Sequence, residues 1–202
     1  MDMYSAVDGV PGDFHLVHLG ARALGGAGLV MTEMVCVSPE GRITPGCAGL
    51  YTGGQAEAWR RITDFAHTRA PGTAIGVQLG HSGRKGSTKL MWEGMDEPLD
   101  DGNWPLVAAS PLPYKPGSQV PRELSRAQLT DLRSGSPPPR YARRGPVSIC
   151  SNCTAPTAIC SPVSSPADQP PHRRLRGSPE KRLRFPLEVF DAVRAVWPGT
   201  GR

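Results

Sequence analysis

The sequence has few aromatic residues and no long apolar run. Aromatic side chains make up 6% of its 202 residues, and no stretch approaches the roughly 18 to 20 consecutive apolar residues of a membrane-spanning helix. The first residues show neither the basic segment nor the apolar segment of an export signal. These absences indicate a cytoplasmic protein that does not contact a membrane.

Cysteine is also scarce. The five cysteines are an odd number in a chain without an export signal, which argues against a disulfide framework. Three of them, Cys150, Cys153 and Cys160, lie close together in the sequence. An alternative interpretation is that they bind zinc together with His172. Because this set lacks a second closely spaced pair, we expect no bound metal.

Acidic residues are almost missing from residues 134–176. This segment holds six arginines and one acidic residue, so it carries the whole formal charge of +5, and it holds nine of the 22 prolines. With so few large apolar side chains, it cannot offset a backbone entropy cost of roughly 1 to 2 kcal/mol per residue. The sequence therefore divides into a patterned part (1–133), a disordered Pro/Ser/Arg-rich insert (134–176) and a short patterned tail (177–202).

The arginines of the insert raise the alternative of a nucleic-acid-binding patch. Such patches combine clustered basic side chains with aromatic residues on which bases stack. Tyr141 is the only aromatic residue in the insert, and the rest of the chain has equal numbers of basic and acidic residues. The sequence therefore indicates no nucleic-acid partner.

Helix and strand patterns alternate outside the insert. Mostly apolar runs predict buried strands at residues 28–37 and 73–79. Helical spacing predicts helices at 13–27 and 55–70, and this order predicts right-handed βαβ units with a parallel sheet. In such α/β folds the chemistry lies where the strands end.

Capping residues and apolar spacing define the ends and faces of the predicted helices. Asp13 is the expected N-cap of the first helix, and Ser125 has capping-box spacing with Gln128 for a third. Ser178 opens a last helix. The positions expected to face the core are Phe14, Val17, Leu19, Ala21 and Leu24 in the first helix, Trp59, Ile62, Phe65 and Ala66 in the second, and Phe185, Leu187, Val189, Phe190, Val193, Val196 and Trp197 in the last.

The loop after the second strand carries most of the polar chemistry. Gln78 closes the strand, and His81, Arg84 and Lys85 follow it. A buried glutamine presents a donor and an acceptor side by side, which suits the imide edge of a flavin pyrimidine ring. The alternative is that these residues are only solvated, as polar loop residues often are.

The sequence gives weaker support for a functional role of the other titratable residues. Glu33 ends the first strand and is more consistent with a structural carboxylate than with a catalytic one. His15 and His18 lie on or beside a helix face as packing or solvated residues, and we expect His67 to be solvated. Among the histidines, His81 has the best claim to a functional role.

Five short motifs occur along the patterned parts of the chain. They are MYSA from Met3, GLVMTE from Gly28, SPEGRI from Ser38, GVQLGHSGRK from Gly76 and GSPEKR from Gly177. In this order and spacing they resemble the Old Yellow Enzyme family of NADH:flavin oxidoreductases. The loop of residues 88–106 is most similar to the reductase-like domain of bifunctional flavoproteins that act on salicylyl-CoA and aminobenzoyl-CoA.

The resemblance implies an FMN-binding (β/α)8 TIM barrel, of which this chain holds roughly the first half. In that family NADH or NADPH passes hydride to flavin N5, and the flavin reduces a small-molecule substrate, an activated alkene or an aromatic acyl-CoA derivative. By motif position, the resemblance implies cofactor binding by Met1, Asp2, Met34 and Gln78, a catalytic and substrate-binding role for Tyr4, and substrate binding by Lys85.

Two features depart from the family pattern. Asp2 stands where many relatives have cysteine or threonine, and an anion there disfavours reduced, anionic flavin. The family's His-x-x-His-Gly-Tyr motif is missing from the insert. With suitable synonymous codons, residues 152–160 read one base out of frame become Glu-Leu-His-Cys-Ala-His-Gly-Tyr-Leu. We therefore hypothesise that residues 134–176 are translated out of frame.

The expected barrel is incomplete, because family members have eight strands and bind the FMN phosphate with the later ones. We therefore expect an open half-barrel that is poorly stable alone and binds FMN weakly or not at all. Two hypotheses follow. The chain is an FMN-dependent oxidoreductase, completed by a homo-oligomer or a complementing chain, or it is a catalytically inactive fragment or mispredicted gene product without flavin. Bound flavin after purification separates the two.

Overall fold

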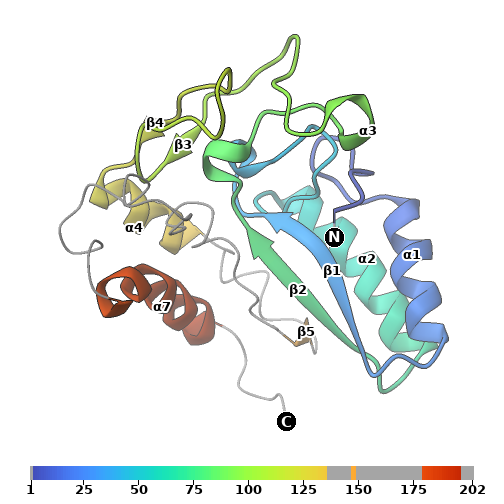
Figure 1. Cartoon of the computed structure of the whole chain (residues 1–202). Helices are drawn as coiled ribbons and strands as arrows, with labels where there is room; N and C mark the ends of the chain where they lie inside the picture. The colour runs from blue at the N-terminus through green and yellow to red at the C-terminus, as the bar shows by residue number, and fades with distance from the viewer. Residues whose placement is uncertain (1, 136–146, 149–178, 197–202) are drawn as a thin grey trace.

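The computed structural model describes residues 2–135, 147–148 and 179–196, and its centre is a parallel β-α-β unit. The strands β1 (Leu29–Cys36) and β2 (Ala74–Gly80) pair in parallel, and α2 (Gly53–Arg69) connects them. A further helix, α1 (Asp13–Leu24), precedes β1 and lies beside α2 next to the two strands (Figure 1). The predicted α/β class with parallel strands is confirmed.

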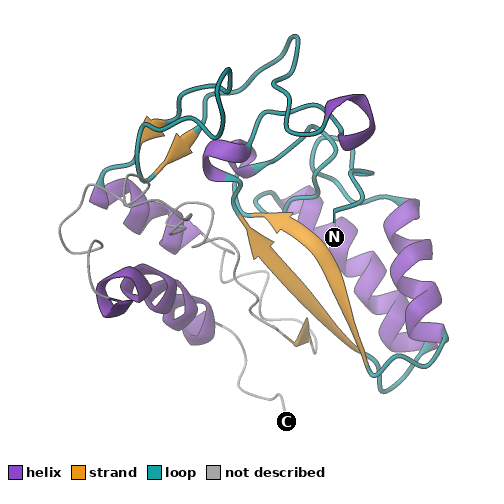
Figure 2. Cartoon of the chain, viewed as in Figure 1, coloured by secondary structure: helices purple, strands orange, loops and turns teal. Residues whose placement is uncertain are grey.

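The strand β5 (Val147–Ser148) extends the sheet in the order β1-β2-β5. It pairs in parallel with β2 and lies within 134–176, where the composition predicted disorder. Residues 134–135 of the insert are helical as well, and its residues 136–146 and 149–176 lie outside the described residues. A second, two-stranded sheet and several helices complete the structure (Figure 2): β3 (Val107–Ala108), β4 (Arg122–Glu123), η1 (Pro39–Gly41), η2 (Gly83–Lys85), α3 (Met91–Gly94), α4 (Arg126–Gly135) and α7 (Pro179–Val196).

One apolar cluster joins the sheet to the helices on both sides. The cluster includes Val35 of β1, Ile75 of β2 and Ile62 of α2. Leu129 of α4 and Phe185 of α7 belong to the same cluster. Because the cluster contains residues of α1 and α2 as well as of α4 and α7, these helices and the sheet share one core. Within the described ranges, no helix is both long and apolar enough to cross a bilayer.

Two helix starts are fixed by capping boxes. The predicted box of α4 is confirmed, since the Gln128 N–H donates to Ser125 Oγ at 3.3 Å and the Ser125 N–H donates to Gln128 Oε1 at 3.0 Å. The second box, between Thr52 and Gln55, was missed. It starts α2 at Gly53, two residues before the predicted start.

The start predicted for α1 was wrong by one residue. Gly12 is the N-cap, and Asp13 is the first helical residue. The Asp13 carboxylate instead forms an ion pair with Arg61 of α2 at 2.7 Å. An acidic residue in the first turn still favours the helix through its dipole.

The apolar face predicted for α1 was also largely wrong. Phe14, Val17 and Leu24 are 51%, 68% and 58% exposed, whereas His15, Leu19, Gly20 and Ala23 are buried. Close packing explains the orientation, because a Cβ on Gly20 would lie 2.7 Å from the Phe65 ring of α2. In α7, likewise, Phe185 and Val189 point inward while Leu187 and Phe190 are exposed.

Replacing Ile62 tests whether the shared core holds the elements together. The Ile62 side chain is 1% exposed, so we expect Ile62→Ala to lower the free energy of unfolding by about 2 to 5 kcal/mol. Leu24→Ala removes a similar side chain from an exposed position and should change it by less than about 0.5 kcal/mol. Urea unfolding followed by far-ultraviolet circular dichroism measures both, and equal losses would contradict the described core.

Candidate functional site

The strands β1 and β2 bring Met34 beside Gln78 at their carboxyl ends. The two residues are Cα partners in the parallel pair, after a register shift between Met31 and Met34. Thr32 bridges this shift, since its Oγ1 accepts a hydrogen bond from the Gln78 N–H at 3.1 Å and donates one to the Glu33 carbonyl at 2.7 Å. Two of the residues predicted to bind the cofactor are therefore neighbours.

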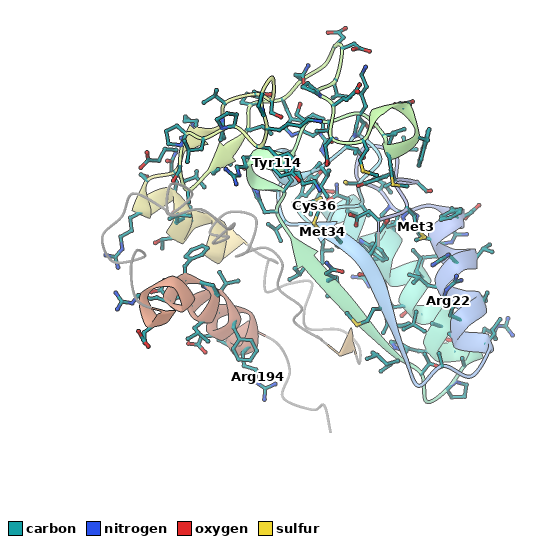
Figure 3. All side chains as sticks on the ribbon, viewed as in Figure 1. Met3, Arg22, Met34, Cys36, Tyr114 and Arg194 are labelled. Carbon is teal, nitrogen blue, oxygen red and sulfur yellow. The ribbon has the colours of Figure 1, made fainter. Side chains whose placement is uncertain are left out.

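Met34 forms an apolar surface at this strand end. Its side chain packs with Cys36 and Cys47, and the Tyr4 ring packs against the same cluster. Gly80 makes room for it, because a Cβ at that position would collide with Met34 Cγ and Sδ. Figure 3 shows Met34 and Cys36 close together at the end of β1.

Glu33 anchors the N-terminal segment to the sheet. Its carboxylate accepts hydrogen bonds from the Met3 N–H at 2.5 Å and from His15 Nε2 at 2.7 Å. His15 Nδ1 in turn accepts from the Gly12 N–H at 3.2 Å. The His15 ring therefore carries its proton on Nε2. Both side chains are buried, which agrees with a structural role for Glu33 and rules out the solvated alternative for His15.

The anchored segment carries Asp2 and Tyr4 to the strand ends. Asp2 Oδ1 accepts a hydrogen bond from the Met34 N–H at 3.0 Å, and burial raises the pKa of the Asp2 carboxyl. The Tyr4 backbone is left-handed, with φ 50°, and its ring lies 6.4 Å from the Trp92 ring between centroids. Burial also raises the pKa of Tyr4, so the phenol stays protonated and can donate a hydrogen bond at neutral pH.

Lys85 lies on the loop side of the same region. Its Nζ is 3.3 Å from Asp96 Oδ1 and 5.4 Å from the centroid of the Tyr114 ring. Burial raises the pKa of the Asp2 carboxyl, and the positive charge of Lys85 offsets a small part of that rise. The structure thus gathers five of the six predicted site residues, while Met1 lies outside the described residues.

Sequence reasoning missed several neighbours of these residues. Trp92 lies in the short helix α3, Asp96 follows it in a segment without periodicity, and Tyr114 comes from a still later segment. Only the tertiary contacts bring them to Tyr4 and Lys85. Thr32 looked like an ordinary strand residue, because a hydroxyl that bridges a register shift leaves no pattern in the sequence.

Metal ligands are a separate question. The cysteines and histidine considered for zinc, at positions 150, 153, 160 and 172, lie outside the described residues. Within the part of the chain that the structure describes, no group of three or more His, Cys, Asp or Glu residues could hold a metal ion.

His81 is fully buried and links the loops that follow β1 and β2. Its Nδ1 accepts a hydrogen bond from the Gly83 N–H at 3.0 Å, and a Cβ on Gly41 would lie 2.9 Å from its ring. The neighbouring Ser82 N–H donates to the Gly41 carbonyl at 2.8 Å. Burial lowers the pKa of His81 to about 4, so the ring is neutral at neutral pH. These contacts indicate a structural role.

His81 makes stability depend on pH in a predictable direction. Its pKa falls from 6.5 to about 4 on folding, so the unfolded chain binds a proton first as the pH drops. The stabilisation is full above pH 6.5 and is lost towards pH 4, by about 3 kcal/mol. His81→Asn keeps an acceptor for the Gly83 N–H and cannot titrate. Urea unfolding at several pH values should therefore show a flatter profile for His81→Asn, and parallel profiles would contradict this role.

Comparison with known proteins relates this geometry to one family. The sequence profile of the NADH:flavin oxidoreductase / NADH oxidase family matches residues 2–127. An NADH:flavin oxidoreductase of Gibberella zeae is 34% identical over 203 residues, which cover 98% of this chain and 49% of that protein. An NADPH dehydrogenase of Geobacillus thermodenitrificans is 29% identical over 202 residues, which cover 98% of this chain and 55% of that protein. The chain spans about half the length of these relatives.

Solved structures show the same fold. Morphinone reductase aligns with a TM-score of 0.73 and 25% identity, over 96% of this chain and 53% of the other. Old Yellow Enzyme from a Pichia species aligns with a TM-score of 0.74 and 22% identity, over 96% of this chain and 50% of the other. The described α/β fold therefore resembles part of the Old Yellow Enzyme barrel. With the family match over most of its length, the chain belongs to the NADH:flavin oxidoreductase / NADH oxidase family.

Proposed function

We propose that the chain forms the Gln78 side of an FMN site in an NAD(P)H-dependent oxidoreductase. The observation that carries this proposal is the pairing of Met34 with Gln78 at the carboxyl end of the sheet. It puts an amide, with its donor and acceptor, next to an apolar thioether side chain. Family membership and the NADPH dehydrogenase among the relatives support the same function.

The residues present fit a flavin ring. Gln78 offers both hydrogen-bonding partners that an imide edge needs, and the Gly80 position leaves space for the Met34 side chain to form an apolar surface. Burial raises the pKa of the Asp2 carboxyl, and its Oδ1 accepts a hydrogen bond from the Met34 N–H. Met1 keeps its proposed role at the ring, although it lies outside the described residues.

Bound FMN would supply hydride transfer from NADH or NADPH to an activated alkene. Tyr4 would bind the substrate and act as its hydrogen-bond or proton donor, since its raised pKa keeps the hydroxyl protonated. Lys85 would contribute a positive charge at the edge of the substrate site, balanced by Asp96. Trp92 covers the Tyr4 ring from the loop side.

Three more specific proposals, on the substrate, the reading frame and the partners, rest on the amino-acid sequence. The loop of residues 88–106 favours an aromatic acyl-CoA-derived substrate, as in the reductase-like domains that it resembles. A translation frame error over 134–176 is supported by the composition of that segment. The third proposal is that the chain acts in the cytoplasm, as a homo-oligomer or with a complementing chain. Sequencing the gene tests the frame hypothesis, and codons incompatible with the shifted motif would reject it.

Replacing Gln78 tests the cofactor site. We expect Gln78→Leu to weaken FMN binding by at least about tenfold, because the flavin edge loses two hydrogen bonds that together contribute at least about 1.4 kcal/mol. Titration of the full chain with FMN, followed by quenching of flavin fluorescence, measures the Kd. Gln128→Leu is the matched control, since Gln128 caps α4 away from the site. A wild-type chain that does not bind FMN, or equal affinities for all three proteins, would overturn the proposal.

Replacing Tyr4 tests the substrate role separately. Tyr4→Phe keeps the ring that packs on Trp92 and removes only the hydroxyl, so the FMN affinity should not change. We expect NADPH-dependent reduction of 2-cyclohexenone to slow by about 100-fold through the loss of the donor. Steady-state kinetics with the flavin-loaded chain measures this rate. An unchanged kcat would place the proton donor elsewhere.

A further inference from the structure

We propose that Cys36 and Cys47 form a reversible disulfide, which makes them an oxidative modification site beside the candidate flavin site. Both cysteines are free and buried, and the proposed function uses neither thiol. The inference involves no flavin, so it stands or falls independently of that function.

The backbone holds the two cysteines on neighbouring segments. The Cys36 N–H donates to the Ala48 carbonyl at 2.8 Å, and the Leu50 N–H donates to the Cys36 carbonyl at 2.9 Å. This pairing sets Cys36 opposite Gly49, so Cys47 lies two residues before its partner position. Both side chains belong to one packed cluster with Met34. A local shift of the segment that carries Cys47 would bring the two sulfur atoms to the disulfide length.

The two thiols differ in their surroundings. Cys47 Sγ accepts a hydrogen bond from the Thr44 N–H at 3.4 Å and lies 3.8 Å from Thr44 Oγ1. The neighbouring Cys36 thiol lowers the pKa of Cys47, whereas the Cys47 thiol and burial raise the pKa of Cys36. Because the thiolate is the reacting form of cysteine, Cys47 attacks the oxidant and Cys36 resolves the product.

The pair contacts the candidate site directly. Cys36 and Cys47 form one cluster with Met34, against which Tyr4 packs. The residue before Cys47 also touches this region, since the Ala6 N–H donates to the Gly46 carbonyl at 3.0 Å and a Cβ on Gly46 would collide with the Tyr4 carbonyl oxygen. A bond between the two sulfurs would therefore shift the segment against which Tyr4 rests.

The reaction balances with hydrogen peroxide as the oxidant. The Cys47 thiolate forms a bond to one peroxide oxygen, the O–O bond breaks, and the departing hydroxide takes a proton to become water. Cys36 then gives up its proton and attacks the Cys47 sulfenic acid. The S–S bond forms, the S–O bond breaks and a second water leaves. Both sulfurs are oxidised, one peroxide is reduced, and a dithiol reverses the change.

The sequence allows a direct assay. Trypsin cleaves after Arg22, Arg42 and Arg60, so Cys36 and Cys47 fall in separate peptides, 23–42 and 43–60. The test uses the full chain with Cys150, Cys153 and Cys160 replaced by Ser. We expect hydrogen peroxide to link the two peptides, dithiothreitol to separate them, and the link to form at least tenfold faster in the folded chain than in urea. Mass spectrometry of the digest measures all three.

Single variants test the order of the two steps. With Cys36→Ser, Cys47 should accumulate as a sulfenic acid that dimedone traps, whereas Cys47→Ser should leave Cys36 unlabelled. Circular dichroism establishes that each variant is folded, and the linked-peptide assay decides the main question even where a variant is not. No linked peptides in the folded chain, or linking that is equally fast in urea, would overturn the disulfide. Dimedone labelling of Cys36 would overturn the assigned order.

Discussion

Thr32 accepts the Gln78 N–H across a register shift between β1 and β2, and the positions of the other candidate groups depend on this contact. The shift makes Met34 the partner of Gln78. A strand slip of one residue would turn these side chains to opposite faces of the sheet. The Thr32 hydroxyl also donates to the Glu33 carbonyl, so one side chain holds both strands at the point where the site begins.

A second constraint acts from the buried Glu33 carboxylate. It receives the Met3 N–H and the His15 ring, so the segment that carries Asp2 and Tyr4 is tied to β1 and to α1 at once. A buried carboxylate is costly unless it is hydrogen-bonded, and two donors here satisfy it. The placement of Tyr4 therefore depends on hydrogen bonds made by its neighbour Met3 and by His15 to Glu33.

The sequence predicted the parts of the structure that follow from local rules. The order of strands and helices, the Ser125 cap of α4 and the buried face of α2 all depend on spacing within one segment. The face of α1 could not be predicted in this way, because the Phe65 ring and the Glu33 carboxylate, both distant in sequence, select which side is buried. The strand β5 was missed for a similar reason, since only pairing with β2 orders such a short segment.

Some residues of the candidate site could be predicted from the sequence, and others could not. Asp2, Met34, Gln78 and Lys85 were selected through motif resemblance, and the fold brings them together with Tyr4. Trp92 of the short helix α3 completes the surroundings together with Asp96 and Tyr114, but all three come from segments whose sequence shows no periodicity. Their positions depend on tertiary contacts such as the Lys85–Asp96 ion pair. The thiol pair was not recognised because ten residues separate Cys36 from Cys47 in the sequence.

The most direct test of the account follows the Gln78 side chain itself. In a 15N-labelled chain, the two hydrogens of the Gln78 amide can be assigned by comparison with Gln78→Leu and followed while FMN is added. The account predicts that these resonances shift in proportion to FMN bound, with the Met34 methyl shifting alongside. Saturable FMN binding that leaves both resonances unmoved would place the flavin elsewhere and contradict the account.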